Sequence, residues 1–138
     1  MNLKEKIYLQ FNKLIPELTV FSIEETKYFY LNILGFKLEY ERAEDNFIFV
    51  SFENSQFMFE ELHDDGWNIG ELEYPLGRGI NFSIKVEDID TLYDKVISHN
   101  IIPFRKIMVS GYRVGDKIKQ QKEFLIQDPN GYLLRFIN

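Results

Sequence analysis

Few side chains in this sequence are suited to metal binding or nucleophilic catalysis. The chain has two histidines and no cysteine, which excludes disulfides, thiolate metal sites and a cysteine nucleophile. His63 lies beside Asp64 and Asp65, and His99 lies near the end of a predicted helix. Neither histidine belongs to an HxH or HExxH pattern, so we interpret both as structural or surface residues.

Two other catalytic patterns are missing from the sequence. No serine has the flanking glycines of a nucleophile elbow, which argues against Ser-His-Asp hydrolysis. The run Gly77-Arg78-Gly79 precedes a predicted strand and is too short for a phosphate-binding loop. These absences shift attention to a possible binding pocket.

Charge is divided unevenly along the chain, whose net charge is −6. Residues 39–73 carry eleven acids and one base, whereas residues 100–138 carry seven bases and three acids. An acidic protein without a basic stripe is a poor nucleic-acid binder, because phosphate neutralisation needs clustered Lys and Arg. The acidic block is better matched to a cationic small molecule.

Length and hydropathy predict one cytoplasmic domain. A chain of 138 residues has room for a single core of ordinary size. No apolar run approaches the roughly 20 residues that a membrane span needs, and the N-terminus lacks the apolar region of a signal peptide. We therefore expect residues 1–138 to form a single cytoplasmic domain with no membrane partner.

Capping signals predict two helices. Ser22, with Glu25 three residues later, forms a capping box that opens a helix ending at Gly35. The apolar side of this helix is predicted to hold Tyr28, Phe29 and residues 31–34. Asp88 opens the second helix, whose apolar face holds Leu92, Tyr93, Val96 and Ile97.

Apolar runs and turn residues predict the remaining elements. Strands are expected at residues 15–21, 36–42, 46–53, 56–62, 79–86, 103–108, 122–127 and 132–137. Residues 1–13 fit either a helix or a strand, with a short helix favoured. Residues 63–78 form a loop-like linker, and residues 109–121 form a basic excursion between two strands.

The two halves of the chain repeat one another. Residues 122–136 predict a β-hairpin closed by Asp128-Pro129-Asn130-Gly131. Residues 49–60 align with residues 124–135 without a gap, and Ser22-Ile23-Glu24 matches Asp88-Ile89-Asp90. The chain is therefore predicted to be an α+β protein of two tandem βαβββ repeats, residues 14–62 and 79–138.

This repeat resembles the vicinal oxygen chelate superfamily, in its glyoxalase and bleomycin-resistance branch. The resemblance covers roughly residues 15–137 and rests on the closing hairpin and four shorter pieces. These are Pro16-Glu17-Leu18-Thr19-Val20, Phe29-Tyr30 before Leu34-Gly35-Phe36, Pro75-Leu76-Gly77-Arg78-Gly79, and Tyr112-Arg113-Val114-Gly115-Asp116. It implies a cupped eight-stranded mixed sheet with the helices outside and a site inside the cup. A tryptophan common in the family before the Tyr-Arg pair is Gly111 here.

Metal-using members of that superfamily hold their ion with four side chains from four strands. The matching positions here are Ile15, Glu60, Asn81 and Arg135, with Glu17 as an alternative for the first. Isoleucine has no donor atom, and a guanidinium repels a divalent cation. We therefore expect no metal and no cofactor, and we predict that Glu60 and Arg135 form an ion pair inside the cup; a solvated Glu60 with Arg135 paired elsewhere remains the alternative.

A cup without metal ligands but rich in aromatic residues suits a flat cationic ligand. The candidate ligand-binding residues are Phe47, Phe49, Met58, Glu60, Trp67, Asn81, Phe104, Tyr112, Arg113, Phe124 and Arg135. Trp67 is the only tryptophan and lies in the polar linker, a position that favours a binding role over a core role.

The resemblance implies a homodimer that sequesters a bleomycin-type or similar cationic aromatic antibiotic without altering it. Family members bind ligand in clefts at the dimer interface and sometimes exchange the N-terminal strand. Two alternatives stay open. One is a metal-dependent glyoxalase, dioxygenase or thiol transferase of the same superfamily, and the other is an interaction module whose cup is plugged by its own Phe side chains.

Overall fold

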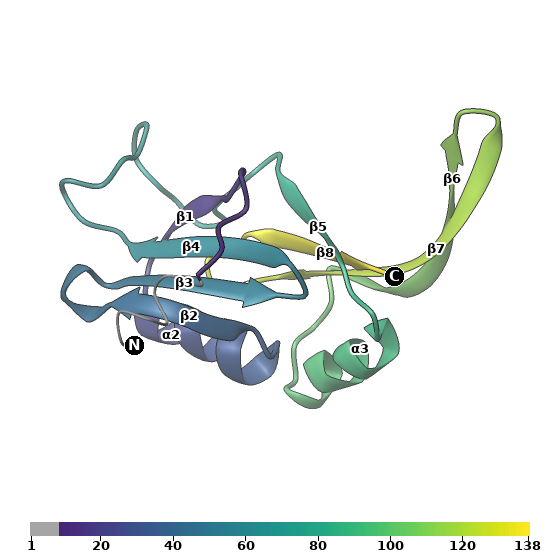
Figure 1. Cartoon of the computed structure of the whole chain (residues 1–138), viewed down its shortest axis with the longest axis horizontal. Helices are drawn as coiled ribbons and strands as arrows, with labels where there is room; N and C mark the ends of the chain where they lie inside the picture. The colour runs from purple at the N-terminus through teal and green to yellow at the C-terminus, as the bar shows by residue number, and fades with distance from the viewer. Residues whose placement is uncertain (1–8) are drawn as a thin grey trace. The chain divides into compact units, whose positions relative to one another are not determined.

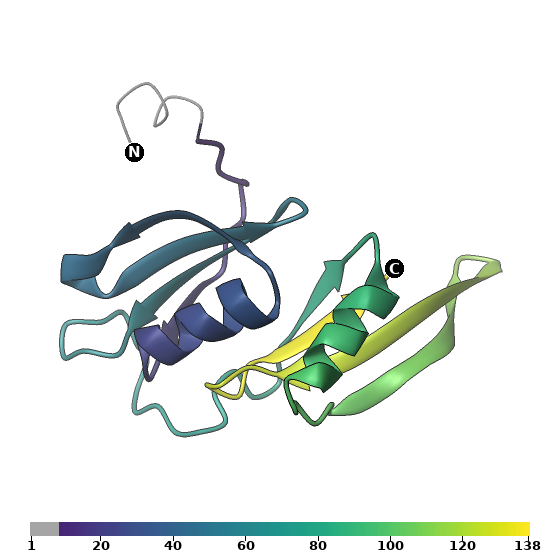
Figure 2. The same cartoon turned by 90° about the horizontal axis from the view of Figure 1, so that it is seen from below.

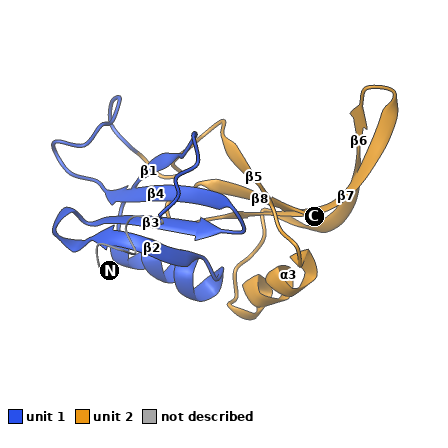
Figure 3. Ribbon diagram, in the orientation of Figure 1, with its two compact units in different colours: residues 1–72 blue, residues 73–138 orange. Residues whose placement is uncertain are grey.

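The computed structural model describes residues 9–138, which divide into two compact units. Unit 1 ends at Leu72 and unit 2 spans Glu73–Asn138 (Figure 3). Most of the helix favoured for residues 1–13 lies outside the described residues, and residues 9–16 form neither helix nor strand. The unit boundary falls inside the predicted linker, so each predicted repeat lies in one unit.

The described residues of unit 1 form a four-stranded sheet, a helix that runs from α2 into η1, and a short 3₁₀ turn (Figure 1). Its elements are β1 (Glu17–Val20), α2 (Ile23–Lys27), the π-helix η1 (Tyr28–Ile33), β2 (Lys37–Arg42), the 3₁₀ turn η2 (Ala43–Asp45), β3 (Phe47–Phe52) and β4 (Ser55–Glu61). The strand order is β1-β4-β3-β2. β1 is parallel to β4, and the other neighbours are antiparallel.

Unit 2 repeats this plan. Its elements are β5 (Asn81–Lys85), α3 (Ile89–Ser98), β6 (Arg105–Val114), β7 (Lys117–Gln127) and β8 (Leu133–Ile137). The order β5-β8-β7-β6, with β5 parallel to β8, matches unit 1 strand for strand. The α+β class and the tandem βαβββ repeats are thereby confirmed, and the eight strands pair as two four-stranded sheets.

Both predicted helix starts are confirmed by their capping bonds. The Ser22 hydroxyl accepts a hydrogen bond from the Glu25 amide at 3.2 Å, and an Asp88 carboxylate oxygen accepts one from the Thr91 amide at 3.1 Å. Gly35 takes a φ of 86° after the first helix, a conformation that glycine adopts without strain.

The first helix differs from its prediction in which residues it buries. After Lys27 it widens into η1, where the Leu34 amide bonds the Phe29 carbonyl at 3.0 Å. This i→i+5 spacing turns the following side chains about the helix axis. Tyr28, predicted to be buried, precedes this bond and is 56% exposed, whereas Tyr30 is fully buried.

Each helix covers one face of its own sheet (Figure 2), and aromatic side chains pack between the helix and the sheet. In unit 1 the Tyr30 ring lies 4.5 Å from Phe59 and 5.3 Å from Phe36, measured between centroids. In unit 2 the Phe124 ring lies 5.0 Å from Tyr93 of α3 and 5.2 Å from Phe136. The opposite face of each sheet, which we call its open face, is not covered by any helix that residues 9–138 form in the same unit.

The hairpins of the two units close with loops of different length. β3 and β4 pair as far as Phe52 and Ser55, so their loop is Glu53-Asn54, and both residues have positive φ. β7 and β8 stop pairing at Gln127 and Leu133, which leaves the longer loop 128–132. The gapless alignment therefore matches structurally equivalent residues in β4 and β8, which follow the loops. It matches residues that are not equivalent in β3 and β7, which precede them.

Because the two loops differ in length, residues that the gapless alignment matched in β3 and β7 lie on opposite faces of their sheets. Glu60 and Arg135 occupy equivalent places, and they pair with Phe47 and Leu125 respectively. The structural counterpart of Phe49 is accordingly Gln127, three positions from the Phe124 that the alignment matched to it. Because side chains alternate along a strand, an odd shift moves a residue to the other face of the sheet.

The basic excursion predicted for residues 109–121 is not a loop but a continuation of the two strands. β6 and β7 pair out to Val114 and Lys117, where Gly115-Asp116 closes the hairpin. β8 pairs with β7 only from Glu123 onward. Residues 109–122 thus form a two-stranded ribbon beyond the rest of the sheet (Figure 1), which we call the arm.

Among residues 9–138, no helix has the length and apolar character that a membrane crossing requires.

Candidate functional site

The open face of the unit 1 sheet brings together four residues predicted to bind ligand. β3 pairs Phe49 with Met58 and Phe47 with Glu60. Paired residues share a face, and alternation puts both pairs on the same one. The intervening Phe59 packs on Tyr30 of the helix, so these four residues lie on the open face.

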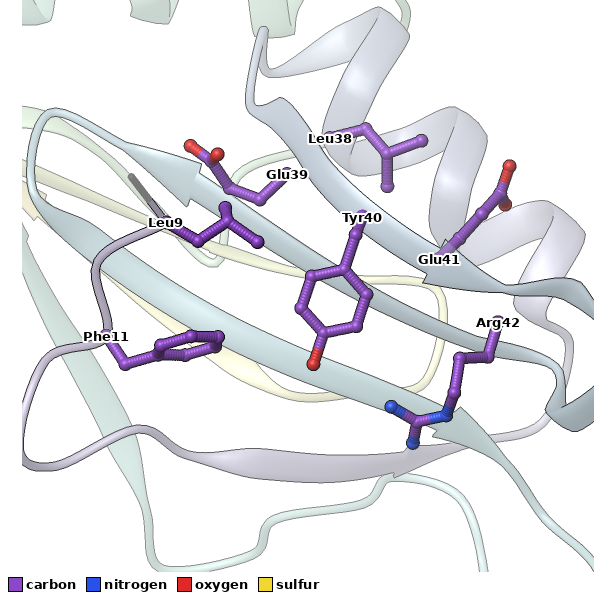
Figure 4. Close-up of a pocket in the computed structure, with 7 residues that line it drawn as sticks. All are labelled: Leu9, Phe11, Leu38, Glu39, Tyr40, Glu41 and Arg42. Carbon is purple, nitrogen blue, oxygen red and sulfur yellow. The ribbon is translucent and has the colours of Figure 1, made fainter. Parts of the chain in front are cut away.

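Two cavities adjoin on this face of unit 1. The larger, which we call the β2 groove, has a volume of about 710 Å³ (Figure 4). Its lining residues are Leu9, Phe11, Leu38, Glu39, Tyr40, Glu41 and Arg42. Figure 4 shows the Tyr40 ring extending from β2 across the middle of the groove. The groove therefore runs along β2, the last strand of its sheet.

The smaller cavity, of about 320 Å³, contains the predicted linker tryptophan, and we call it the Trp67 cavity. Its lining residues are Glu17, Tyr40, Arg42, Phe47, Met58, Glu60, His63, Asp65, Gly66 and Trp67. The Trp67 side chain is 95% exposed. The cavity joins aromatic rings to three carboxylates, a combination that attracts an aromatic cation through both stacking and charge.

Local hydrogen bonds fix the loop that carries Trp67. His63 Nε2 lies 3.1 Å from Glu60 Oε1, and His63 Nδ1 accepts a hydrogen bond from the Asp65 amide at 3.2 Å. The Asn68 side chain accepts a bond from the Thr19 hydroxyl of β1 at 2.7 Å. The contacts of His63 and the bond of Asn68 therefore hold the chain on both sides of Trp67, and His63 also lines the cavity.

Inside the Trp67 cavity, a positively charged side chain of the protein packs on an aromatic ring. The Arg42 guanidinium carbon lies 3.9 Å from the centroid of the Phe47 ring, and Arg42 Nε donates to Asp45 at 3.0 Å. Cation–π contacts of this kind depend on the electron-rich face of the ring. The cavity therefore has surfaces that accommodate a positive group.

Phe49, the fourth open-face residue, is covered by the chain's own N-terminal segment. The Phe11 ring stacks on it with centroids 5.0 Å apart and planes 9° apart. Gln56 holds the segment by accepting from the Asn12 amide at 2.7 Å and donating to the Gln10 carbonyl at 2.9 Å. Phe49 is fully buried as a result, and Phe11 forms part of the β2 groove in its place.

In unit 2, Tyr112 and Arg135 meet at a buried carboxylate. The Tyr112 hydroxyl donates to Glu123, and Arg135 Nη1 lies 3.8 Å from the same carboxylate. Burial by itself would raise the pKa of Glu123, but hydrogen bonds from Tyr112, Ser110 and Gln121 and the charge of Arg135 outweigh it and lower that pKa. Arg135 therefore has an ion-pair partner within its own unit.

The predicted pair of Glu60 and Arg135 joins residues of different units and stays a prediction. Within its own unit, Glu60 contacts His63. The Nε atom of Arg135 is buried and has no hydrogen-bond partner among the described residues.

The remaining candidates of unit 2 are dispersed. Phe124 is fully buried under α3 and belongs to the core, on the face opposite to Arg135 and Glu123. Phe104 precedes β6, is 56% exposed and has the Arg105 guanidinium 5.7 Å from its ring. Arg113 is exposed in the arm, and Asn81 is exposed at the start of β5. They line none of the cavities described above.

The strand register corrects one position of the predicted ligand set. In unit 2, Asn81 pairs with Leu133, and the equivalent of Leu133 in unit 1 is Met58, whose partner is Glu17. The first of the four positions is therefore Glu17 and not Ile15. The sequence had offered both, and the alternation around residues 15–21 favoured the wrong one, because β1 begins only at Glu17.

The corrected set still does not fit a divalent metal. Glu17 and Glu60 are carboxylates on neighbouring strands, but the two unit 2 positions supply a neutral amide and a fixed positive charge. A guanidinium supplies no lone pair for a metal ion, and its charge repels a cation. Within the described part of the chain, no three acidic or histidine side chains gather in a way that could hold a metal.

Five residues of β2 that the sequence did not single out line the cavities, namely Leu38, Glu39, Tyr40, Glu41 and Arg42. The register of β2 shifts between Leu38 and Tyr40. This bulge breaks the simple alternation, so Glu39 and Tyr40 both line the β2 groove. Only the run of aromatic and charged residues around residue 40 could have indicated them.

Comparison with solved structures shows the same fold in several bacterial proteins. A glyoxalase/bleomycin resistance protein/dioxygenase from Alicyclobacillus acidocaldarius is 25% identical, with a TM-score of 0.64 over 91% of this chain and 89% of its own. An integron cassette protein from the mobile metagenome of V. cholerae is 17% identical, with a TM-score of 0.67 over 94% and 96% of the two chains. TioX from Micromonospora sp. ML1 is 14% identical, with a TM-score of 0.69 over 93% and 98%.

A search of curated proteins gave no match. The family model of the glyoxalase/bleomycin resistance protein/dioxygenase superfamily matches residues 11–136, which include every residue that lines the Trp67 cavity and all but the last two residues of the two repeats. On the tandem βαβββ units and this match, the chain belongs to the glyoxalase/bleomycin resistance protein/dioxygenase superfamily, the vicinal oxygen chelate superfamily.

Proposed function

We propose that this protein binds a cationic aromatic small molecule, of the bleomycin type or similar, in the Trp67 cavity and without a metal. The observation that carries the proposal is an exposed tryptophan beside three carboxylates, Glu17, Glu60 and Asp65, in one cavity. A flat cation would stack on Trp67 while the carboxylates offset its charge.

The superfamily name covers both resistance proteins and dioxygenases, so membership leaves catalysis open. The donor set favours binding over metal-dependent catalysis, since Arg135 stands where a ligand would be needed. The plugged-module alternative has one specific observation in its favour, because Phe11 stacks on Phe49 and covers it. That contact fills part of the open face but leaves the Trp67 cavity, which Phe11 does not line.

Calorimetric titration of the metal-free protein with bleomycin tests the proposal directly. We expect binding near one ligand per chain that is unchanged when zinc or nickel is added. Stoichiometric metal uptake without drug binding would overturn the proposal in favour of an enzyme. If neither drug nor metal binds, titration with a planar cationic dye separates a different ligand from a plugged face, since a plugged face binds no probe.

Trp67 provides an independent optical readout, because it is the only tryptophan in the chain. Ligand stacking should change its fluorescence, and Trp67→Ala should weaken binding by about 1–3 kcal/mol. The matched control is Tyr28→Ala, which removes another exposed aromatic ring of unit 1 that lines neither cavity. Equal affinities for the two variants would remove Trp67 from the site.

A further inference from the structure

His63 closes the turn that leads to Trp67 with two hydrogen bonds, one to its main chain and one to its ring. The His63 carbonyl accepts from the Gly66 amide at 3.1 Å, and His63 Nδ1 accepts from the Asp65 amide at 3.2 Å. On the far side of Trp67, the Asn68 amide donates to the Gly66 carbonyl at 3.0 Å. The ring bond therefore fixes the backbone two residues before the tryptophan, within residues 63–68, which we call the Trp67 loop.

The contacts of His63 determine which of its ring nitrogens carries the proton. A backbone amide can only donate, so Nδ1, which faces the Asp65 amide, must present its lone pair. We therefore assign the proton to Nε2, which lies 3.1 Å from Glu60 Oε1 and donates to it. His63 is neutral in this arrangement, because both ring nitrogens are donors in the charged form.

Protonation of His63 breaks one of its two ring bonds and keeps the other. A proton added at Nδ1 points at the Asp65 amide, so two donors face each other and the hydrogen bond between them is lost. The bond from Nε2 to Glu60 becomes charge-assisted and therefore stronger. The ring thus stays on β4, while the backbone at residue 65 is released.

The charged groups around His63 are mostly acidic. His63 lines the Trp67 cavity and also a smaller cavity of about 220 Å³. Among residues 9–138, the charged and titratable residues that line these two cavities with it are Glu17 of β1, Tyr40 and Arg42 of β2, Glu44 and Asp45 of η2, Glu60 and Glu61 of β4, and Asp65 of the loop. Asp64 follows His63 directly in the chain.

A charged His63 also changes what the Trp67 cavity attracts. The other charged side chains that line this cavity are three carboxylates and one guanidinium, so protonation of His63 takes their net charge from −2 to −1. A weaker negative charge attracts a cation less strongly.

We propose that neutral His63 positions Trp67 for ligand binding, and that protonation of His63 releases the Trp67 loop and weakens the binding of an aromatic cation. Histidine ordinarily changes its charge between about pH 5 and 8, so the cavity should bind such a cation more tightly at about pH 8 than at about pH 5.5. The loss of a fixed stacking surface and the added positive charge act in the same direction. The binding half of this inference rests on the proposed function, whereas the loop half concerns the protein without ligand.

Nuclear magnetic resonance of the ligand-free protein tests the loop half. The chain has two histidines and one tryptophan, so the ring and indole signals can be assigned with two histidine variants. As the pH falls from about 8 to about 5.5, we expect the Asp65 amide proton to move upfield and the Trp67 indole signal to shift, both with the midpoint of the His63 ring. The lower limit stays above the ordinary titration range of carboxyl groups.

The two histidines provide a matched pair of variants. His63→Gln keeps a neutral side chain that does not titrate, and His99→Gln makes the same change after α3, where His99 Nδ1 lies 2.8 Å from the Lys95 carbonyl of its own helix. The pH response of the Trp67 indole should vanish in His63→Gln and persist in His99→Gln. A wild-type Asp65 amide that does not follow the His63 ring, or a response that survives in His63→Gln, would overturn the proposal.

Titration with ethidium, a planar aromatic cation whose charge is constant over this pH range, tests the binding half. We expect wild type and His99→Gln to bind ethidium at least about fivefold more weakly at the lower pH limit, and His63→Gln to bind it equally at both limits. The same pH dependence in both variants would contradict the inference. Absence of ethidium binding at both limits overturns the proposed function and the binding half together, whereas the magnetic resonance titration decides the loop half independently.

Discussion

Glu123 is the buried carboxylate on which Tyr112 and Arg135 of unit 2 converge. Its charged form is favoured despite burial, because three hydrogen bonds and a guanidinium oppose the cost of desolvation and leave its pKa below the ordinary value. Because the pKa of Glu123 is lower in the folded state than in the unfolded state, its carboxylate stabilises the fold at pH values above the unfolded-state pKa. That contribution is lost as the pH falls through the folded-state pKa.

Glu123→Gln should therefore be less stable than wild type at neutral pH, and the difference should shrink on acidification. Urea unfolding followed by circular dichroism at several pH values measures this. The matched control is Glu71→Gln, at an exposed position of unit 1. A stability difference that does not depend on pH would mean that the hydrogen bonds of Glu123, and not its charge, hold the network.

The pKa of Tyr132 is shifted in the opposite direction, so its contribution to stability is lost as the pH rises. Burial, with a smaller contribution from Asp128, raises the pKa of Tyr132 from 10.0 to about 12. The neutral phenol thus stabilises the fold fully below pH 10, and this contribution is lost between about pH 10 and 12. Tyr132→Phe should lose less stability over that interval than wild type. Spectrophotometric titration should show one tyrosine ionising late, and its absence would contradict the shift.

The elements of the fold were predictable where the signal is local. Ser22, Gly35 and Asp88 marked helix ends correctly because capping depends on residues close in sequence. The closing turn was predictable for the same reason, and the Asp128 carboxylate accepts bonds from the Asn130 and Tyr132 amides at 2.8 and 3.0 Å. Repetition of these signals then indicated the tandem units.

Strand register was less predictable because it depends on distant pairing. Nothing near Phe124 reveals that its hairpin loop is longer than that of unit 1, so the gapless alignment placed it on the ligand side. Ile15 was preferred to Glu17 for a related reason, since only pairing with β4 fixes where β1 begins. Of the residues that line the Trp67 cavity, the sequence therefore indicated Phe47, Met58, Glu60 and Trp67. It did not indicate Tyr40 and Arg42.

Ser22→Ala tests how much one cap contributes to an element. The α-helical part of the first helix is five residues long, so few other bonds compensate. We expect a loss of about 1 kcal/mol in the free energy of unfolding, measured by chemical denaturation. Ser22→Asn keeps an acceptor and should remain close to wild type. Equal losses for both variants would show that the hydroxyl matters for another contact.

At the scale of the whole molecule, the predicted ion pair between Glu60 and Arg135 would couple the two units. A double-mutant cycle with Glu60→Gln and Arg135→Met measures that coupling as the non-additive part of the stability change. Residues in contact typically give about 0.5–3 kcal/mol. A coupling within error of zero would leave Glu60 with His63 and Arg135 with Glu123, the contacts each makes in its own unit.

The three-residue offset between the hairpins bears on any attempt to rebuild this protein as two identical halves. A design that copied one repeat over the other by aligning residue 49 with residue 124 would turn the first hairpin strand inside out. Buried phenylalanines would face water, and polar residues would face the helix. A symmetric version must therefore transplant each loop together with both of its strands, because the loop length determines which side of the sheet each residue occupies.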